Sequence, residues 1–476
     1  MKSFKKYPIL LASIISVHAV ANSSNIVDEA EALAVDAKFY ASSYGVPYDE
    51  AVRRLILMHG TSSTISKIRN EVKNNLQGMY FDNSKNDFGL KVNVANYSTN
   101  VPKVLSIQPQ SSQAVQSILS SKGNAALRKQ FNVSDADIRT VANQYSQPLT
   151  AAISFNKQIY KTKEERLKNI SHKKQELQKA LPNLTLVYDD EKTGAAKVYV
   201  KSDNGSTKQV AERILNVPVN VIVVPYSSRV ATRGGSPLLA TTPASIKGQV
   251  ACFSGFIGKR NGVMGIITAG HCAHVDENMS DVQYSDRDGT KYIIPLLSAS
   301  QPITSGWRDD SVADLGFLPA GTSAAQAAKA EFYADSSVNY RKLTATKSRA
   351  GTAWDNGTVN GAYICHLGKT GEYATTLTQS CGEVDSINGS NADGNGNTFV
   401  IVKNTNGNAG HPHTSGQGSL RCYHGDSGGP WFALTTGYGI MHSCDWQGQD
   451  SSTPVTIARY TSLDYLYSIG TTIVTQ

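Results

Sequence analysis

The chain has 476 residues, of which 18% are charged and 40% are hydrophobic, which excludes a disordered polar chain and allows two or three domains. With 39 Gly and 16 Pro, the composition also excludes collagen-like and low-complexity classes. The net charge of +8 is divided unequally, because residues 22–233 hold 28 basic and 19 acidic side chains and residues 234–476 hold 15 and 19. We expect these oppositely charged halves to attract each other. The Lys and Arg of the first half are scattered, which disfavours a nucleic-acid site.

The first 21 residues have the pattern of a secretory signal peptide. Three Lys precede a short apolar run at 9–17, and a small-x-small cleavage site follows at 19–21. This run is too short to span a bilayer, which disfavours the alternative of a membrane anchor. The pattern predicts a secreted protein, or a periplasmic one, without a membrane span and in a compartment where disulfides form.

Residues 22–233 predict two small α+β lobes. Apolar residues three and four positions apart predict helices at 26–44, from Pro47 onward, at 164–180 and at 210–215. Alternating apolar residues predict strands at 89–95 and 219–224. A strand–turn–strand pattern at 80–94 recurs weakly about 107 residues later, at 187–200. This half has no Cys, and we expect its two histidines, His59 and His172, to be packing or surface residues of helices.

The second half carries three motifs in a fixed order. Thr-Ala-Gly-His-Cys at 268–272 ends an apolar run, Asp-Leu-Gly-Phe-Leu lies at 314–318, and Gly-Asp-Ser-Gly-Gly-Pro lies at 425–430. A serine hydroxyl is a poor nucleophile at neutral pH, so it needs a nearby base that is itself oriented by a carboxylate.

The motifs thus predict Ser427 as the nucleophile, His271 as the general base and acid, and Asp314 as the carboxylate that orients His271. Asp309 and Asp310 remain alternatives to Asp314. We prefer Asp314 because it opens an apolar run, whereas the other two lie in a polar loop.

These motifs resemble those of the chymotrypsin-like serine peptidases, and more narrowly the bacterial secreted branch that includes α-lytic protease and the streptogrisins. The resemblance implies a mainly β peptidase domain of two six-stranded antiparallel barrels at 234–476, preceded by a signal peptide at 1–21 and an α+β pro-region at 22–233. It also implies an oxyanion hole formed by the N–H groups of Gly425 and Ser427, with no cofactor and no metal.

All six cysteines lie in the second half, and six cysteines allow fifteen pairings. The resemblance implies the disulfides Cys252–Cys272, Cys422–Cys444 and Cys365–Cys381. A metal site built from cysteines with His274, His366 or His424 is disfavoured, because the sequence has no C-x-x-C pair.

The sequence departs from the family's pattern around the specificity pocket. The segment 439–444 is shorter than usual; Arg421 or His442 would favour an acidic substrate residue, and Asp445 a basic one. The sequence therefore leaves the preferred substrate side chain open.

Together these features predict a secreted serine endopeptidase that is made as a zymogen. The polar segment 227–236 predicts an exposed linker, cleaved near 228–234 to release the pro-region. We expect a monomer whose partners are protein or peptide substrates and its own pro-region, which assists the slow folding of the barrels and occludes the cleft. A terminal helix is expected at 462–469.

Two alternative functions remain. A catalytically silent homologue acting in binding or adhesion is disfavoured because His271, Asp314 and Ser427 are all present. An esterase or lipase is disfavoured because the sequence lacks a G-x-S-x-G elbow and the histidine precedes the serine.

Overall fold

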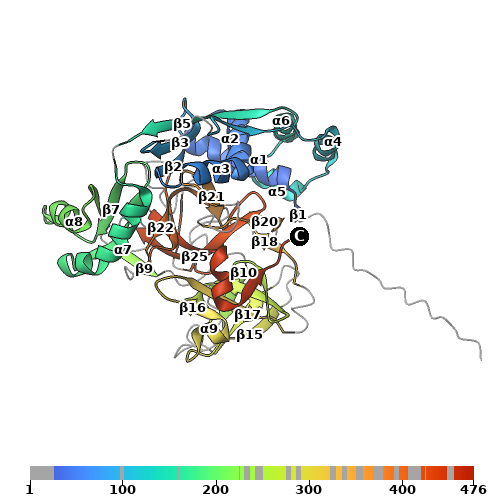
Figure 1. Ribbon diagram of the computed structural model, residues 1–476. Coiled ribbons are helices and arrows are strands. Elements are labelled where there is room, and N and C mark those ends of the chain that lie inside the picture. Colours follow the sequence, from blue (N-terminus) through green and yellow to red (C-terminus); the bar gives the residue numbers. More distant parts are fainter. Residues whose placement is uncertain are drawn as a thin grey trace, which may run out of the picture.

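The computed structural model describes most of the chain from residue 26 onward (Figure 1). The described residues are 26–96, 101–158, 160–224, 226–229, 236–241, 250–274, 280–285, 291–321, 328–334, 340–349, 357–367, 379–390, 396–405, 420–423, 425–446 and 455–476. The predicted signal peptide, and residues 230–235 of the predicted linker, lie outside them.

The first lobe packs six helices with a four-stranded sheet of order β2-β3-β5-β4. Its helices are α1 (Glu29–Tyr44), α2 (Tyr48–Gly60), α3 (Ser62–Val72), α4 (Ser112–Ser120), α5 (Ala125–Gln130) and α6 (Asp135–Tyr145). Its strands are β2 (Leu76–Asp82), β3 (Gly89–Val94), β4 (Val104–Ile107) and β5 (Leu149–Lys157). The side chain of Asp28 accepts the Glu31 N–H at 2.8 Å and begins α1, and Gly45 ends it with a φ of 62°. The helix predicted at 26–44 is confirmed from Glu29 onward, whereas Ile26–Val27 form strand β1; the strand predicted at 89–95 is confirmed as β3.

The second lobe has a three-stranded sheet of order β6-β7-β8 and two helices. The elements are α7 (Lys163–Ala180), β6 (Leu184–Asp190), β7 (Ala195–Val200), α8 (Thr207–Leu215) and β8 (Val219–Val223). In both lobes an antiparallel hairpin, β2–β3 or β6–β7, is extended by a parallel strand, β5 or β8. The weak sequence repeat therefore corresponds to a repeated structural unit.

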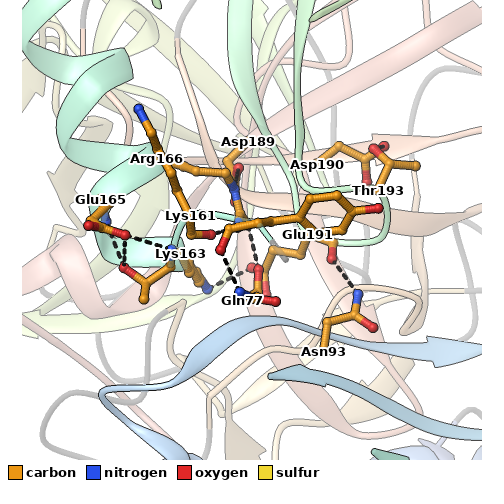
Figure 2. A network of polar contacts seen from close by, with 12 residues as sticks. Gln77, Asn93, Lys161, Lys163, Glu165, Arg166, Asp189, Asp190, Glu191 and Thr193 are labelled. Atoms are coloured by element: carbon orange, nitrogen blue, oxygen red, sulfur yellow. Dashed lines mark hydrogen bonds and ion pairs between the residues drawn. The ribbon is translucent and has the colours of Figure 1, made fainter. Parts of the chain in front are cut away.

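A buried polar network joins the two lobes (Figure 2). The guanidinium of Arg166 on α7 binds both carboxylate oxygens of Asp189 on β6, at 2.6 and 2.9 Å, and also donates to the Gln77 carbonyl on β2. Glu191, which follows β6, accepts the Met79 N–H and forms an ion pair with Lys163 at 2.6 Å. Because Arg166, Asp189 and Glu191 are nearly inaccessible and each has polar partners, the network fixes one lobe against the other.

The second half is mainly β, as predicted, and contains one closed barrel. Strands β25, β24, β21, β22, β23 and β26 pair in that order, and β26 pairs again with β25. These strands are β21 (Tyr363–His366), β22 (Ser380–Gly389), β23 (Phe399–Lys403), β24 (Pro430–Ala433), β25 (Thr436–Trp446) and β26 (Val455–Ser462). The expected six-stranded barrel is therefore present at the C-terminal end.

The other barrel of the prediction is two separate sheets in the described part of the chain. One has the order β11-β10-β14-β15 and the other β16-β17-β13-β12-β27. Their strands are β10 (Ser236–Ala240), β11 (Val250–Ser254), β12 (Ile257–Arg260), β13 (Val263–Thr268), β14 (Asp281–Ser285), β15 (Lys291–Pro295), β16 (Trp307–Asp309), β17 (Asp314–Pro319) and β27 (Thr471–Ile473). This subdomain is a half-open barrel, with the short α9 (Pro302–Ser305) beside it and the 3-10 helix η3 (Leu463–Ile469) where a terminal helix was predicted.

The two halves are bound together through strands and buried charges. Strand β1 (Ile26–Val27) pairs in parallel with β19 (Tyr340–Lys342), which also pairs with β18 (Glu331–Tyr333); the short β20 (Ala345–Thr346) pairs with β25. Asp36 on α1 forms a buried ion pair with Arg341 at 2.9 Å. On the second lobe, Lys197 and the Tyr188 hydroxyl each donate to Asp385 on β22 at 2.6 Å. Lys197 with Asp385 has the polarity expected from the net charges of the halves, whereas Asp36 with Arg341 has the opposite one.

Candidate active site

The first motif places His271 directly after a buried strand. β13 ends at Thr268, and η2 (Gly270–Cys272) turns the chain so that the imidazole leaves the sheet edge. A Cβ at Gly270 would lie 1.9 Å from the Arg308 carbonyl, so only glycine fits there. The disulfide Cys252–Cys272 ties this turn to β11.

Asp314, the first residue of β17, meets His271 at this turn. Its Oδ1 accepts the His271 backbone N–H at 2.9 Å, and its Oδ2 lies 2.7 Å from the His271 Nδ1. Burial of the Asp314 side chain raises the pKa of its carboxyl group. The two imidazoles beside it, His271 and His442, lower this pKa by a larger amount, so the net pKa lies well below the ordinary value. Asp314 is therefore a carboxylate at neutral pH.

The two alternative aspartates do not occupy this position. Asp310 pairs with Arg308 at 2.7 Å and accepts the N–H groups of Val312 and Ala313, so it closes its own loop. Asp309 lies on β16, opposite Asp314 in the strand pairing. Of the three candidates, Asp314 is the one that the structure places against the His271 backbone and ring.

Ser427 lies in a tight turn between Cys422 and β24. Gly425 and Gly428 have φ values of 122° and 90°, which an L-residue rarely adopts. Ser427 is fully buried, and its hydroxyl donates to the carbonyl oxygen of His442 at 3.3 Å. Within the described part of the chain, the N–H groups of Gly425 and Ser427 have no protein acceptor. A pair of buried donors without an acceptor is what an oxyanion site requires.

His442 on β25 belongs to this cluster, although the sequence named it only as a candidate for substrate specificity. Its Nδ1 lies 2.7 Å from the same Asp314 Oδ2 that His271 contacts, and the two rings are 6.1 Å apart at 70°. His442 therefore contacts two of the three predicted residues: its ring nitrogen lies within hydrogen-bond distance of Asp314, and its main-chain carbonyl accepts a hydrogen bond from Ser427. The sequence left open whether His442 favours an acidic substrate residue, and in the structure its Nδ1 contacts Asp314.

The other charges proposed for specificity are also engaged within the protein. Asp445 and Arg459 form a fully buried ion pair at 2.5 Å, which neutralises Asp445. Arg421 is buried and donates to the Gln379 carbonyl at 3.3 Å. The three disulfides are Cys252–Cys272, Cys365–Cys381 and Cys422–Cys444, and the last ties the Ser427 loop to β25.

The residues considered for a metal site have other partners. All six cysteines are in disulfides. His274 stacks on Trp307 with ring centroids 4.1 Å apart, and His366 lies 2.8 Å from the Arg421 carbonyl. His424 lies outside the described residues. The group within the described residues that could hold an ion is His271, Asp314 and His442, where both Nδ1 atoms already face the carboxylate.

Comparison with solved structures gives matches that cover about half of this chain and nearly all of each matched chain. One match is Thermobifida fusca Protease A, with 16% identity, 51% of this chain and 98% of the matched chain covered, and a TM-score of 0.29. Nocardiopsis protease has 16% identity, with 47% of this chain and 92% of the matched chain covered and a TM-score of 0.29. Cellulomonas bogoriensis chymotrypsin has 15% identity, with 52% of this chain and 99% of the matched chain covered and a TM-score of 0.30. The matches are bacterial chymotrypsin-like serine proteases. No family model and no curated protein matches the sequence.

Two further features concern the environment of the protein. Within the described residues, no helix is both long and apolar enough to cross a membrane. The three disulfides fit an oxidising, extracytoplasmic compartment.

Proposed function

We propose that the protein is a secreted serine endopeptidase that hydrolyses peptide bonds through an acyl-enzyme on Ser427. The observation that carries this proposal is the buried contact of the Asp314 carboxylate with the His271 Nδ1, in the same cluster as the Ser427 turn. The carboxylate fixes the proton on Nδ1, so Nε2 is the ring nitrogen whose lone pair would accept the serine proton.

In the proposed reaction His271 accepts the Ser427 proton as the hydroxyl oxygen attacks the peptide carbonyl. The N–H groups of Gly425 and Ser427, which have no acceptor among the described residues, would receive the developing oxyanion. The imidazolium of His271 then gives its proton to the leaving amine, and water hydrolyses the acyl-enzyme by the same steps. Asp314 stays ionised throughout, since the two imidazoles beside it favour its charged form by more than burial opposes it.

We also propose that residues 22–233 are a pro-region which inhibits the peptidase until cleavage near 228–234. Strand β9 (Tyr226–Arg229) pairs antiparallel with β25, and Arg229 lies opposite Ser443. The direction of β9 leads the chain toward His442, whose carbonyl contacts the Ser427 hydroxyl. An extended segment on this edge would occupy the place of a substrate strand. The signal peptide at 1–21 would bring this zymogen out of the cytoplasm.

Replacement of the nucleophile tests the proposal. Ser427→Ala should lower peptide-ester hydrolysis by about 10^5-fold or more and should leave the chain unprocessed. Ser390→Ala is a matched control, because Ser390 is also fully buried in the second half and its hydroxyl has no partner among the described residues. Equal activity of the Ser427→Ala and Ser390→Ala proteins would refute the assignment.

The same protein also distinguishes the silent-homologue alternative. A serine-directed phosphonylating reagent should label the processed wild-type chain at Ser427. If the reagent does not label the processed chain, a binding protein without catalysis is the better assignment.

A further inference from the structure

Two basic side chains from opposite halves of the chain approach each other beside α3. Arg69 on α3, in the first half, donates through Nη2 to the Thr358 carbonyl at 2.8 Å. Thr358 donates its backbone N–H to the Ser348 carbonyl at 2.8 Å, and the residue before Ser348 is Lys347. These contacts place the Lys347 segment of the second half against α3 of the first half.

Neither cation is matched by an acidic side chain among the described residues. Lys347 is 7% exposed, and its ammonium group has no hydrogen bond or ion pair there. The Nη1 of Arg69 is buried and has no acceptor in the same part of the chain. The charge of Glu191 acts on Arg69, but its two carboxylate oxygens already bind the Met79 N–H and the Lys163 ammonium. The interface therefore brings together two positive charges without a counter-charge of their own.

The electrostatics of the two groups agree with these contacts. Burial, followed by the positive charge of Arg69, lowers the pKa of Lys347 to about 8. Burial also lowers the pKa of the Arg69 guanidinium by more than Glu191 raises it. His59, near the end of α2, adds no charge at neutral pH, because burial and then the Lys347 charge lower its pKa to about 3. A buried cation without a counter-charge is costly, and like charges that face each other across an interface repel.

A further donor on the same segment is buried without a partner. Asn360 lies two residues beyond Thr358 and is 5% exposed. Its side-chain Nδ2 has no acceptor among the residues that the structure describes. Buried polar groups in proteins are almost always hydrogen-bonded, so donors that lack an acceptor at one interface indicate a ligand that supplies acceptors.

We propose that Arg69 and Lys347 form a binding site for a small inorganic oxyanion of the phosphate or sulfate type, which joins the two halves of the chain. Guanidinium and ammonium groups both donate to such anions, and separate oxygens of one tetrahedral anion can accept from each. A bound anion would supply the missing counter-charge to both cations. This inference goes beyond the peptidase assignment and does not depend on catalysis at Ser427.

The two parts of the site come from different halves, so anion binding and association of the halves support each other. The anion contacts both cations only while α3 lies against the Lys347 segment. A ligand that binds the folded chain and not the unfolded one raises the ratio of folded to unfolded protein by a factor that grows with its concentration. The strength of the hold between the halves should therefore depend on the anion content of the solution.

Urea unfolding of the full chain carrying Ser427→Ala, which prevents processing, tests the proposal. Sodium phosphate, sodium sulfate and sodium chloride would be compared at equal ionic strength. Phosphate and sulfate should raise the folded-to-unfolded ratio in a saturating manner, by about 100-fold at about 100 times the dissociation constant. Lys347→Met and Arg69→Met should lose this response, whereas Lys342→Met, which changes an exposed lysine on β19, should keep it.

Two further readouts keep the test decisive. In a buffer without these anions, Lys347→Met should be at least as stable as its parent, because the substitution removes a buried charge without a partner. Calorimetric titration of phosphate into the parent chain should detect one site, which Lys347→Met lacks.

Three results would overturn the anion site. An equal response of all the variants would identify a general salt effect. A response to chloride as strong as that to phosphate would exclude an oxyanion site. A large loss of stability in Lys347→Met without added anion would show that the protein itself already pairs this lysine. Each of these results would leave the peptidase assignment intact, because the site lacks any of the proposed catalytic residues.

Discussion

The ion pair between Asp36 and Arg341 offers a quantitative test of how the first half holds the second. Asp36 is 2% exposed and Arg341 is 0% exposed. The Asp36 carboxylate accepts hydrogen bonds from both terminal nitrogens of Arg341, at 3.0 and 2.9 Å. It also accepts hydrogen bonds from the Gln379 side-chain amide at 2.8 Å and from the Leu434 backbone N–H at 3.0 Å. Asp36→Leu would leave the guanidinium buried without its counter-charge, which typically costs about 3–5 kcal/mol.

The size of this effect can be checked with a double-mutant cycle. The unfolding free energy would be measured by urea titration of the full chain in the Ser427→Ala background, which prevents processing during the assay. Asp36→Leu and Arg341→Met should each lower it by about 3 kcal/mol or more, whereas the double variant should lose far less than the sum. A single variant that loses under about 1 kcal/mol, or a double variant that loses the full sum, would refute the reasoning.

Three further predictions concern the interface, the serine turn and folding. Burial, assisted by the nearby Lys347 charge, lowers the pKa of His59 to about 3, so the free energy of unfolding should decline as pH falls from about 6.5 toward 3. Urea titrations at pH 7 and pH 5 should show a smaller decline in His59→Gln than in the wild type. An unchanged decline in the variant would contradict this prediction. Gly428→Ala should abolish activity because its Cβ would lie 2.2 Å from Thr268 Oγ1, whereas Gly321→Ala, with open space around it, should retain activity in the same ester assay. Residues 234–476 expressed alone should refold poorly, and the yield of active enzyme should rise when 22–233 is added in trans; efficient unaided refolding would remove this claim.

The elements of the chain were predictable because their signals are local. Helix α1 has its cap at Asp28 and its stop at Gly45, and the repeated hairpins follow from alternating residues beside short turns. The meeting of His271 with Asp314 followed from the motifs and the resemblance, since the sequence alone does not show that residues 43 apart are in contact.

Contacts that depend on register or on distant segments could not be predicted in the same way. His442 lies at a register shift between Met441 and Ser443 in the β25–β26 pairing, so simple alternation does not give the direction of its side chain. Asp36 would be expected on an exposed helix face, because an aspartate is rarely buried without a partner. Its partner, Arg341, lies 305 residues away in the sequence.

The contacts between the halves bear on what happens to the chain after it is cut. After a cut near 228–234, the pairing of β1 with β19 and the contacts of Asp36 with Arg341 and of Lys197 with Asp385 would all remain. The nicked product would then run as two bands on a denaturing gel and still elute from a sizing column as one particle. Liberation of the mature enzyme would require digestion of the N-terminal fragment, so the supply of protease molecules that are already active would set the pace at which others appear.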